Sequence, residues 1–222
     1  MSDWPFEPID INTLSQDEMR LSWQEFLRTI SRRRSVREFS DRPVPAGIIR
    51  TAIQAAGSAP SGANMQPWHF VAVSNPGLKT RMRAAAEQEE RELYGHRASD
   101  EWLKALEPLG TNADKPFMET APWLITDFLK KFTFDDKGNR YKNYYTTESV
   151  GIACGFLLAA LHWSGLATLT HTPSPMKFLG DILERPPTER AYMVIVAGYP
   201  AEDARVPVIG KQPIGRISTF LE

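Results

Sequence analysis

The sequence predicts an α+β domain of layered helices and strands. Segments with apolar residues at helical spacing alternate along the chain with short apolar runs, and about four of these runs are typical of strands. Glycine or proline follows most of the predicted elements and indicates where they end. A chain of 222 residues can bury a full core without disulfides or metals, so we expect a single domain over 1–222.

Composition argues against several classes of function. The 26 basic and 27 acidic side chains give a formal net charge of −1, whereas binding to nucleic acid needs a broad basic surface. The four histidines lack metal-ligand spacing, so we expect no metal. The start is unlike a signal peptide, and the longest apolar run, 150–161, is shorter than the ~20 residues that cross a bilayer. We therefore expect a cytoplasmic protein without a membrane segment. The single cysteine, Cys154, lies inside the apolar run, so we expect it to be a buried structural thiol.

The chain is expected to begin with an extended arm over 1–14, followed by a helix. Ser15 and Glu18 form a capping box, in which each side chain accepts from a backbone N–H of the other residue. Residues 1–24 comprise this arm and the start of the helix. Apolar residues recur at helical spacing along one face: Met19, Trp23, Phe26, Leu27 and Ile30.

A second helix is predicted over 46–56, with Gly57 as its C-cap. The loop that follows, 58–68, consists mostly of small residues that would let a flat ligand approach the backbone. Gly62 is able to take a positive φ there. An ordinary turn would explain the same loop. Residues 69–74 are strand-like.

A turn at 75–77 leads into a helix over about 76–93. The second half of this helix, 87–92, is strongly acidic, and such runs are usually solvated faces. From 94 to 115 the pattern weakens, which is typical of a mobile loop. We therefore assign an active-site lid to 87–118.

Three further strands and one long apolar helix are predicted in the second half of the chain. Residues 121–129 are strand-like, and 149–164 are apolar on every side, which is typical of a helix that is centrally buried or lies in a subunit interface. Strands are also predicted over 167–170 and 191–197, with a short helix over 176–183 between them.

The last residues, 201–222, have little pattern of their own. Arms at both ends of a compact domain suggest that each subunit embraces a second one. We expect a C-terminal extension toward the partner subunit, with a disordered end as the alternative.

A basic cluster at 31–37 is the first candidate for a binding site. Its members are Arg32, Arg33, Arg34, Ser35 and Arg37. Arg suits phosphate because its planar fork makes two parallel charge-assisted hydrogen bonds. So many like charges repel one another unless an anion is bound or paired there. From the residues alone, a solvated basic turn at a helix end is the alternative.

Several short motifs resemble, in order and spacing, the flavin-dependent nitroreductase superfamily and, within it, the iodotyrosine deiodinase family. They are 33–37, 58–63, 66–68, 170–173 and 198–200, and the segment 149–160 adds to the similarity. The resemblance covers about residue 25 to the C-terminus. It implies a layered α/β/α fold with a mixed, mainly antiparallel central sheet. It also implies an intertwined homodimer with FMN bound at the subunit interface.

The resemblance implies a set of FMN contacts. The residues are Arg33, Arg34, Ser35, Arg37, Ser61, Gly62, Thr170, His171, Thr172 and Lys211. The Arg cluster would hold the phosphate, and the Thr172 hydroxyl would donate to N5 of the flavin. Lys211 stands where animal members of the family carry an arginine, so it keeps the charge but loses the fork.

The resemblance also implies a lid that grips the amino-acid end of a substrate through Glu90, Tyr94 and Lys115. A zwitterion needs an anion for its ammonium group and a cation for its carboxylate, which Glu90 and Lys115 supply. Tyr94, four residues after Glu90 and so on the same helix face, can cover an aromatic ring. The backbone N–H of Ala63 would meet the phenolate oxygen of the substrate. A solvated acidic helix and a surface lysine are the alternative.

The function implied is FMN-dependent reductive dehalogenation of halotyrosines, converting 3-iodotyrosine to tyrosine and iodide, with Thr172 and Ala63 as catalytic residues. The electron donor, NAD(P)H or a reductase, is not identified by the sequence. A general NAD(P)H-dependent nitroreductase or quinone reductase is the first alternative, although it has no use for a zwitterion clamp. A binding protein without turnover is the second.

Overall fold

The computed structural model describes residues 5–222, which fall into two units that divide between Arg33 and Arg34. The first four residues of the predicted arm lie outside this description, and 5–15 have no regular structure. Helix α1 (Gln16–Ile30) follows. Its capping box is confirmed, since the Ser15 N–H donates to Glu18 Oε2 at 2.8 Å and the Glu18 N–H donates to Ser15 Oγ at 3.4 Å. The predicted apolar face forms, but no residue of α1 is buried within the structure.

The larger unit is built on a four-stranded sheet. Its strands are β1 (Trp68–Val73), β2 (Trp123–Lys130), β5 (Ala167–His171) and β6 (Glu189–Gly198). Their order is β1-β2-β6-β5 and every pairing is antiparallel. A parallel bridge between Ser35 and Thr168 lies on the outer edge of β5. The mainly antiparallel sheet expected from the sequence is therefore confirmed.

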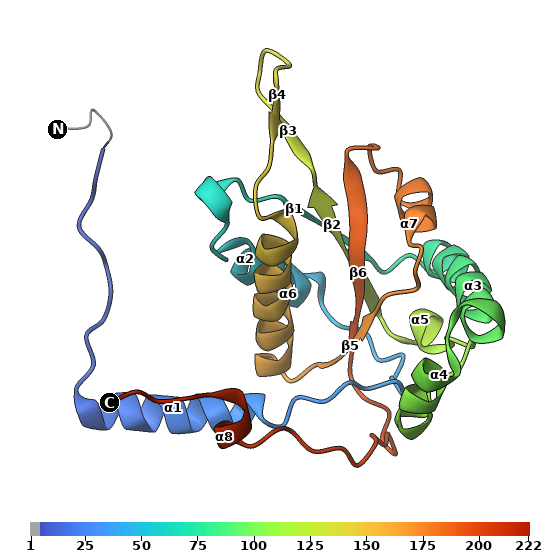
Figure 1. Cartoon of the computed structure of the whole chain (residues 1–222), viewed down its shortest axis with the longest axis horizontal. Coiled ribbons are helices and arrows are strands. Elements are labelled where there is room, and N and C mark those ends of the chain that lie inside the picture. The colour runs from blue at the N-terminus through green and yellow to red at the C-terminus, as the bar shows by residue number, and fades with distance from the viewer. Residues whose placement is uncertain (1–4) are drawn as a thin grey trace. The chain divides into compact units, whose positions relative to one another are not determined.

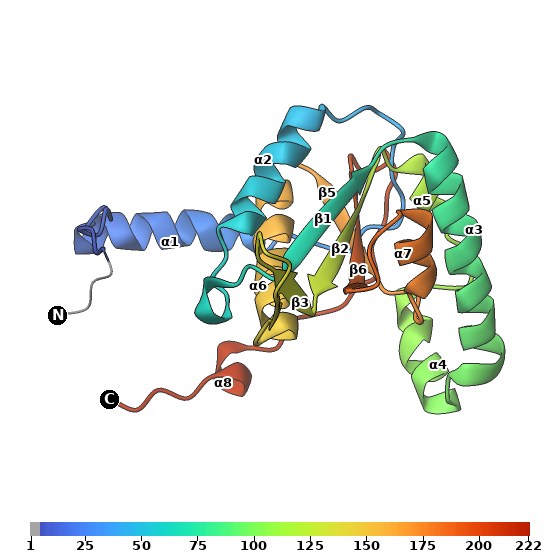
Figure 2. The same ribbon diagram turned by 90° about the horizontal axis from the view of Figure 1, so that it is seen from above.

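Alternation along the strands produces two cores, one on each face of the sheet. In β2, Ile125 and Leu129 belong to one core, whereas Leu124 and Phe128 belong to the other. Helices α2 (Ala46–Gly57) and α6 (Thr146–Trp163) cover the first face. Helices α3 (Pro76–Glu92), α5 (Phe117–Thr120) and α7 (Lys177–Ile182) cover the second (Figures 1 and 2). The α/β/α layering is thus confirmed.

The remaining elements are short. Directly after β2, a hairpin of β3 (Phe132–Phe134) and β4 (Arg140–Lys142) projects from the larger unit (Figure 1). The other elements are η1 (Gly62–Asn64), η2 (Leu93–Arg97), α4 (Asp100–Leu106), η3 (Glu107–Leu109) and α8 (Ile214–Ile217). Within residues 5–222, none of the helices has the length and apolar character needed to cross a membrane.

Two local predictions were wrong, each for a local reason. Helix α2 continues through Gly57, and Ser58 is its C-cap. The segment 75–77 is not a turn that ends a strand, because the Asn75 side chain caps α3 by accepting from the Leu78 N–H at 3.0 Å. The segment 94–115 contains the short helices η2, α4 and η3, and its role as a lid stays a prediction. In the loop after α2, positive φ occurs at Ala63, Asn64 and Gln66 and not at Gly62, which was able to take it.

Candidate active site

Most of the predicted substrate-binding residues and the loop 61–63 form two groups on different sides of the sheet, and the remaining predicted residues of the larger unit are described after them. One group gathers where α3, the lid and the end of β5 meet, and includes Glu90, Lys115 and His171. The other group, 61–63, lies in the loop between α2 and β1, against the start of α6. Both views of the ribbon place this loop on the α6 side and the lid on the α3 side (Figures 1 and 2).

The centre of the first group is a buried ion pair. Lys115 Nζ lies 3.2 Å from Glu90 Oε2, and both side chains are less than a tenth exposed. The same ammonium donates to the Asn112 carbonyl and lies 5.6 Å from the centroid of the Tyr94 ring. His171 Nδ1 is 3.9 Å from the other oxygen of Glu90. The sequence-predicted clamp residues are therefore together, and the two opposite charges face each other.

Local structure explains why Lys115 reaches Glu90. Lys115 is held at its backbone, where its N–H donates to Glu87 Oε1 at 2.7 Å. Glu87 lies one turn before Glu90 on α3 and is itself paired with Arg83 at 2.7 Å. The lid is thus tied to α3 at two successive turns. Sequence reasoning missed Glu87 and Asn112; the only signal was the acidic run in which Glu87 stands.

The electrostatics of this group are dominated by burial. Burial lowers the pKa of Lys115, and the charge of Arg37 adds to this effect, whereas Glu90 opposes it. Burial, together with Lys115 and Arg37, lowers the pKa of His171 to about 3. His171 is therefore neutral at physiological pH. Its Nε2 is buried and has no hydrogen-bond partner among the described residues.

The part of the Arg cluster in the larger unit lies beside β5. The Val36 N–H donates to the Thr168 carbonyl at 3.1 Å, which brings Ser35 and Arg37 to the outer edge of that strand. Arg34 donates to the Pro207 carbonyl. Ser35, Arg37 and Arg205 line a cavity of about 390 Å³. Arg37 also lines a neighbouring cavity of about 200 Å³.

Residues at the end of β5 point in alternate directions. His171 packs toward the lid, with its ring edge-on to Phe117 at a centroid distance of 5.8 Å. Thr170 and Thr172 are exposed, and they continue the side of the strand on which Thr168 lies. The His171 side chain therefore belongs with the lid residues, and the two threonine hydroxyls are presented on the opposite face.

The loop 61–63 is held in an unusual conformation. Ala63, Asn64 and Gln66 all have φ between 47° and 53°, a region that residues other than glycine seldom occupy. The Gly62 N–H donates to Ser149 Oγ at 3.4 Å, and the Gln66 N–H donates to Ser61 Oγ at 2.9 Å. Strain of this kind persists where the surrounding structure enforces it, and it is concentrated at functional sites.

Glycine is needed at position 62 for space. A Cβ there would lie 2.8 Å from Tyr145 Cδ2 and 3.1 Å from the Tyr144 carbonyl oxygen. The start of α6 therefore presses on this loop and fixes the backbone of Ala63. The Gly62–Tyr145 contact carries no sequence signal, because the two segments meet only in the folded chain.

The two groups do not meet within one chain. Strand β1, which follows the loop, and β5 are the two edges of the sheet, three inter-strand spacings or about 14 Å apart. Lys211 is exposed, and no hydrogen bond or ion pair joins it to the other predicted phosphate ligands within the described residues. Arg33 ends the N-terminal unit, so its role stays a prediction.

The residues beside β5 fit FMN. Arginine forks and a serine hydroxyl suit a phosphate group, and Ser35, Arg37 and Arg205 line this cavity together with the carboxylates of Glu38 and Glu107. Glu38 accepts a hydrogen bond from the Arg205 N–H at 2.6 Å. The exposed hydroxyls of Thr170 and Thr172 on an edge strand suit the polar edge of a flat ring. The His171 ring packs on the opposite face, toward the lid residues, and does not contribute to this fit.

Comparisons with known proteins agree with this description. Residues 30–199 match the model of the nitroreductase family. The chain is 52% identical over 191 residues to an iodotyrosine deiodinase from Haliscomenobacter hydrossis, covering 86% of each chain. It is 40% identical over 213 residues to iodotyrosine deiodinase 1 from Homo sapiens, covering 95% of this chain and 73% of the human one.

A solved structure is also similar. It is oxidised iodotyrosine deiodinase bound to FMN and 3-iodo-L-tyrosine, at 29% identity and a TM-score of 0.74, with 88% of this chain and 100% of that chain covered. The match to the family model and the identity to these relatives extend over most of the chain. The chain therefore belongs to the nitroreductase family, together with its iodotyrosine deiodinase relatives.

Proposed function

We propose that this protein is an FMN-dependent dehalogenase that converts 3-iodotyrosine and related halotyrosines to tyrosine and halide. Exchange of the carbon–iodine bond for a carbon–hydrogen bond takes two electrons and one proton and releases iodide. When FMN is bound and reduced, it supplies those electrons, and the protein supplies binding and orientation. The similarity to deiodinases, one of them solved with FMN and 3-iodo-L-tyrosine, supports this proposal.

The observation that carries the proposal is the buried Glu90–Lys115 pair. A zwitterion that enters between the two side chains gives Glu90 an ammonium partner and Lys115 a carboxylate partner, so neither charge is left unpaired. A substrate without the amino-acid group cannot make this exchange. The ring of Tyr94, already beside the Lys115 ammonium, would cover the substrate and exclude water.

Other residues of the chain would hold FMN and orient the substrate. Ser35 and Arg37 would bind the phosphate, with Arg33, Arg34 and Lys211 as further candidates. Thr170, Thr172 and the backbone at His171 would bind the ring. In the loop, Ser61 and Gly62 would lie along the cofactor. The Ala63 N–H, held by its left-handed backbone, would donate to the phenolate oxygen.

We propose that the active site is completed by a second copy of this chain. The loop 61–63 and the lid lie on different sides of one sheet, so a shared site requires the loop of one subunit to meet the lid of its partner. The outer face of α6 exposes Ile152 and Phe156, which suits a subunit interface. The cytoplasmic location stays a prediction, as does the identity of the electron donor.

A complementation experiment tests the shared site. Gly62→Leu would block the loop and Lys115→Met the lid, and each homodimer should be inactive. In mixed dimers, one of the two sites would carry neither change, so random mixing should restore about a quarter of the wild-type sites. No recovery on mixing, with dimers present, would contradict a site built from two chains.

The activity itself is tested under anaerobic conditions. The FMN-loaded protein is reduced with dithionite, and 3-iodotyrosine or 2-iodophenol is added while tyrosine or phenol and iodide are measured. We expect stoichiometric tyrosine and iodide, and little turnover of 2-iodophenol, which lacks the zwitterion. Equal turnover of both, or reduction of a nitroaromatic with 3-iodotyrosine untouched, would favour a general nitroreductase. Tight binding without iodide release would indicate a binding protein.

A further inference from the structure

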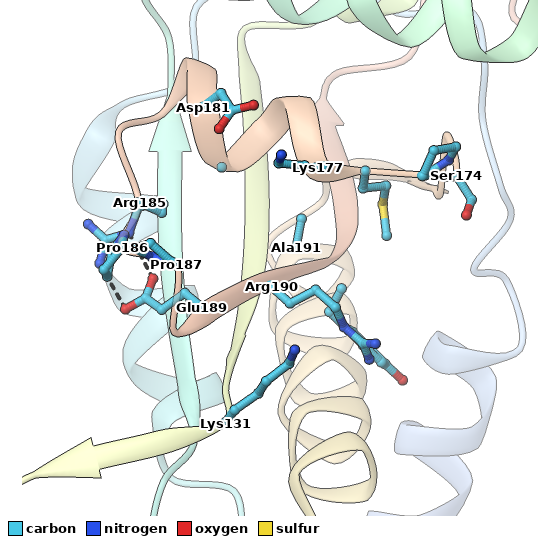
Figure 3. Close-up of a pocket in the computed structure, with 14 residues that line it drawn as sticks. Lys131, Ser174, Lys177, Asp181, Arg185, Pro186, Pro187, Glu189, Arg190 and Ala191 are labelled. Carbon is cyan, nitrogen blue, oxygen red and sulfur yellow. Dashed lines mark hydrogen bonds and ion pairs between the residues drawn. The ribbon is translucent and has the colours of Figure 1, made fainter. Parts of the chain in front are cut away.

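A second pocket lies apart from the proposed active site, between α7 and the first half of β6 (Figure 3). Its volume is about 950 Å³, at the upper end of the ~300–1,000 Å³ that ligand pockets occupy. The walls come from the segments 174–181 and 185–192, and from Lys131 after β2. None of the residues assigned to the dehalogenation site lines it.

The pocket has an excess of positive charge. Its lining includes four cationic side chains and two carboxylates: Lys131, Lys177, Arg185 and Arg190 against Asp181 and Glu189. Glu189 is already engaged, because Arg185 donates to both of its oxygens at 2.8 and 2.9 Å. This leaves one carboxylate for three cations.

The remaining cations are placed to bind an anion. Lys131, Lys177 and Arg190 form no ion pair with any residue in the described part of the chain. Figure 3 shows the side chain of Lys131, which follows β2, extending toward Arg190, whereas Lys177 lies with Asp181 at the opposite end of the pocket. Like charges that converge without a carboxylate between them repel each other, and a bound phosphate would relieve that repulsion.

Much of the remaining lining is apolar. Pro186 and Pro187 at one end, and Pro175 with Met176 at the other, provide apolar surfaces against which a planar ring can pack. Ligand pockets typically combine such surfaces with a few charged groups that fix orientation. A ligand that carries both a ring and phosphate groups matches both halves of this pocket.

We propose that this pocket binds a phosphorylated small molecule of nucleotide size, with Lys131 and Arg190 holding its phosphates. The site is independent of the dehalogenation chemistry. One residue of the pocket lining, Ser174, is nevertheless only two residues along the chain from Thr172, a proposed FMN contact. A ligand bound here therefore contacts the segment that continues from the end of β5.

The test is equilibrium dialysis of the FMN-loaded protein with ADP and, separately, with pyrophosphate. We expect ADP to bind more tightly than pyrophosphate, and more weakly as salt is raised. Lys131→Gln and Arg190→Gln should each weaken ADP binding about tenfold, because each removes a charged phosphate contact. Lys142→Gln is the matched control, since it removes the same charge from an exposed hairpin residue outside the pocket, and it should leave ADP binding unchanged.

Three results would overturn the proposal. They are no measurable ADP binding at millimolar concentration, equal binding of ADP and pyrophosphate, and unchanged ADP binding in the Lys131→Gln/Arg190→Gln double variant. The FMN content of every variant is measured alongside, so that a folding defect is recognised. Both substituted side chains are exposed, and loss of FMN is not expected.

Discussion

Two buried polar pairs in the larger unit are constructed in opposite ways. Glu90 and Lys115 form an ion pair at 3.2 Å, and Lys115 has further contacts to the Asn112 carbonyl and the Tyr94 ring. On the other side of the sheet, the Cys154 thiol donates to Asp127 Oδ2 at 2.8 Å. Burial raises the pKa of Asp127 to about 7 and also raises the pKa of Cys154, so this second pair is close to neutral.

The difference shows where the fold tolerates charge. A buried ion pair is costly unless its partners are well matched, and it is weak evidence for stability. Glu90 and Lys115 retain one where, in the proposed function, a zwitterionic ligand exchanges partners with it. Under α6, burial keeps the Cys154 thiol protonated at neutral pH and the Asp127 carboxyl largely protonated below about pH 7, and Cys154 packs as part of the core.

The two regions also respond to pH with opposite signs. The pKa of His171, in the lid group, is lowered to about 3. Between pH 6.5 and about 3 the unfolded chain therefore binds a proton at this residue that the folded protein does not bind. Asp127 has its pKa raised to about 7, so the folded protein keeps a proton that the unfolded chain loses above pH 3.8. The first group makes the fold less stable as pH falls, and the second makes it less stable as pH rises.

His171→Gln should produce the largest change. Acidification from pH 6.5 toward 3 costs the wild type on the order of 5 kcal/mol through this residue, or about 1.4 kcal/mol per pH unit. The variant lacks this cost, so its free energy of unfolding should fall less steeply on acidification. Urea denaturation at intervals from pH 4.5 to 7.5, at matched FMN content, measures the slope. Parallel curves for variant and wild type would mean that His171 titrates normally.

Asp127→Asn should have a somewhat smaller effect of the opposite sign. Between pH 3.8 and about 7 the wild type loses on the order of 4 kcal/mol through this carboxyl, and above pH 7 the loss is complete. The variant removes that slope and should gain stability relative to the wild type as pH rises. The same urea series measures it. If the free energy of unfolding of the variant instead falls relative to that of the wild type as pH rises, Asp127 is ionised in the folded protein.

Glu90→Gln should weaken halotyrosine binding about 100-fold, which corresponds to roughly 2.7 kcal/mol for one charge-assisted contact in a buried site. Binding of 2-iodophenol should be unchanged, because it has no ammonium group. Titration of the bound flavin's fluorescence measures both affinities. Glu92→Gln, an exposed carboxylate of the same helix, is the control and should bind both ligands like the wild type. If Glu90→Gln binds halotyrosine as tightly as the wild type, Glu90 does not bind the substrate ammonium group.

Cys154→Ser should have the smallest effect. Serine keeps a donor for Asp127, and no step of the proposed reaction uses the thiol, so iodotyrosine turnover should stay within about twofold of the wild type. Because its pKa is raised, Cys154 should also resist iodoacetamide in the folded protein and react only in denaturant. Rapid alkylation of the native protein would show that the second pair is more accessible than its burial indicates.

Local structure was largely predictable from the sequence. The Ser15–Glu18 capping box, the apolar run that forms α6 and the apolar run of β6 depend on residues close together in the chain, and all three form where they were expected. The motifs that resemble the nitroreductase family are equally local, and the family match confirms them. Helix propensity, capping and strand alternation act over a few residues, so a linear pattern is enough to reveal them.

The tertiary structure decided which of those residues meet. The sequence indicated that Glu90 and Lys115 would grip a ligand, but only the fold shows them paired with each other and tied to α3 through Glu87. It allowed positive φ at Gly62, whereas the fold packs Tyr145 close to that glycine and places the left-handed backbone at Ala63. It gave no sign of the basic pocket beside α7, whose cations come from three separate segments. Contacts of this kind depend on how distant segments pack, and no pattern of neighbouring residues encodes them.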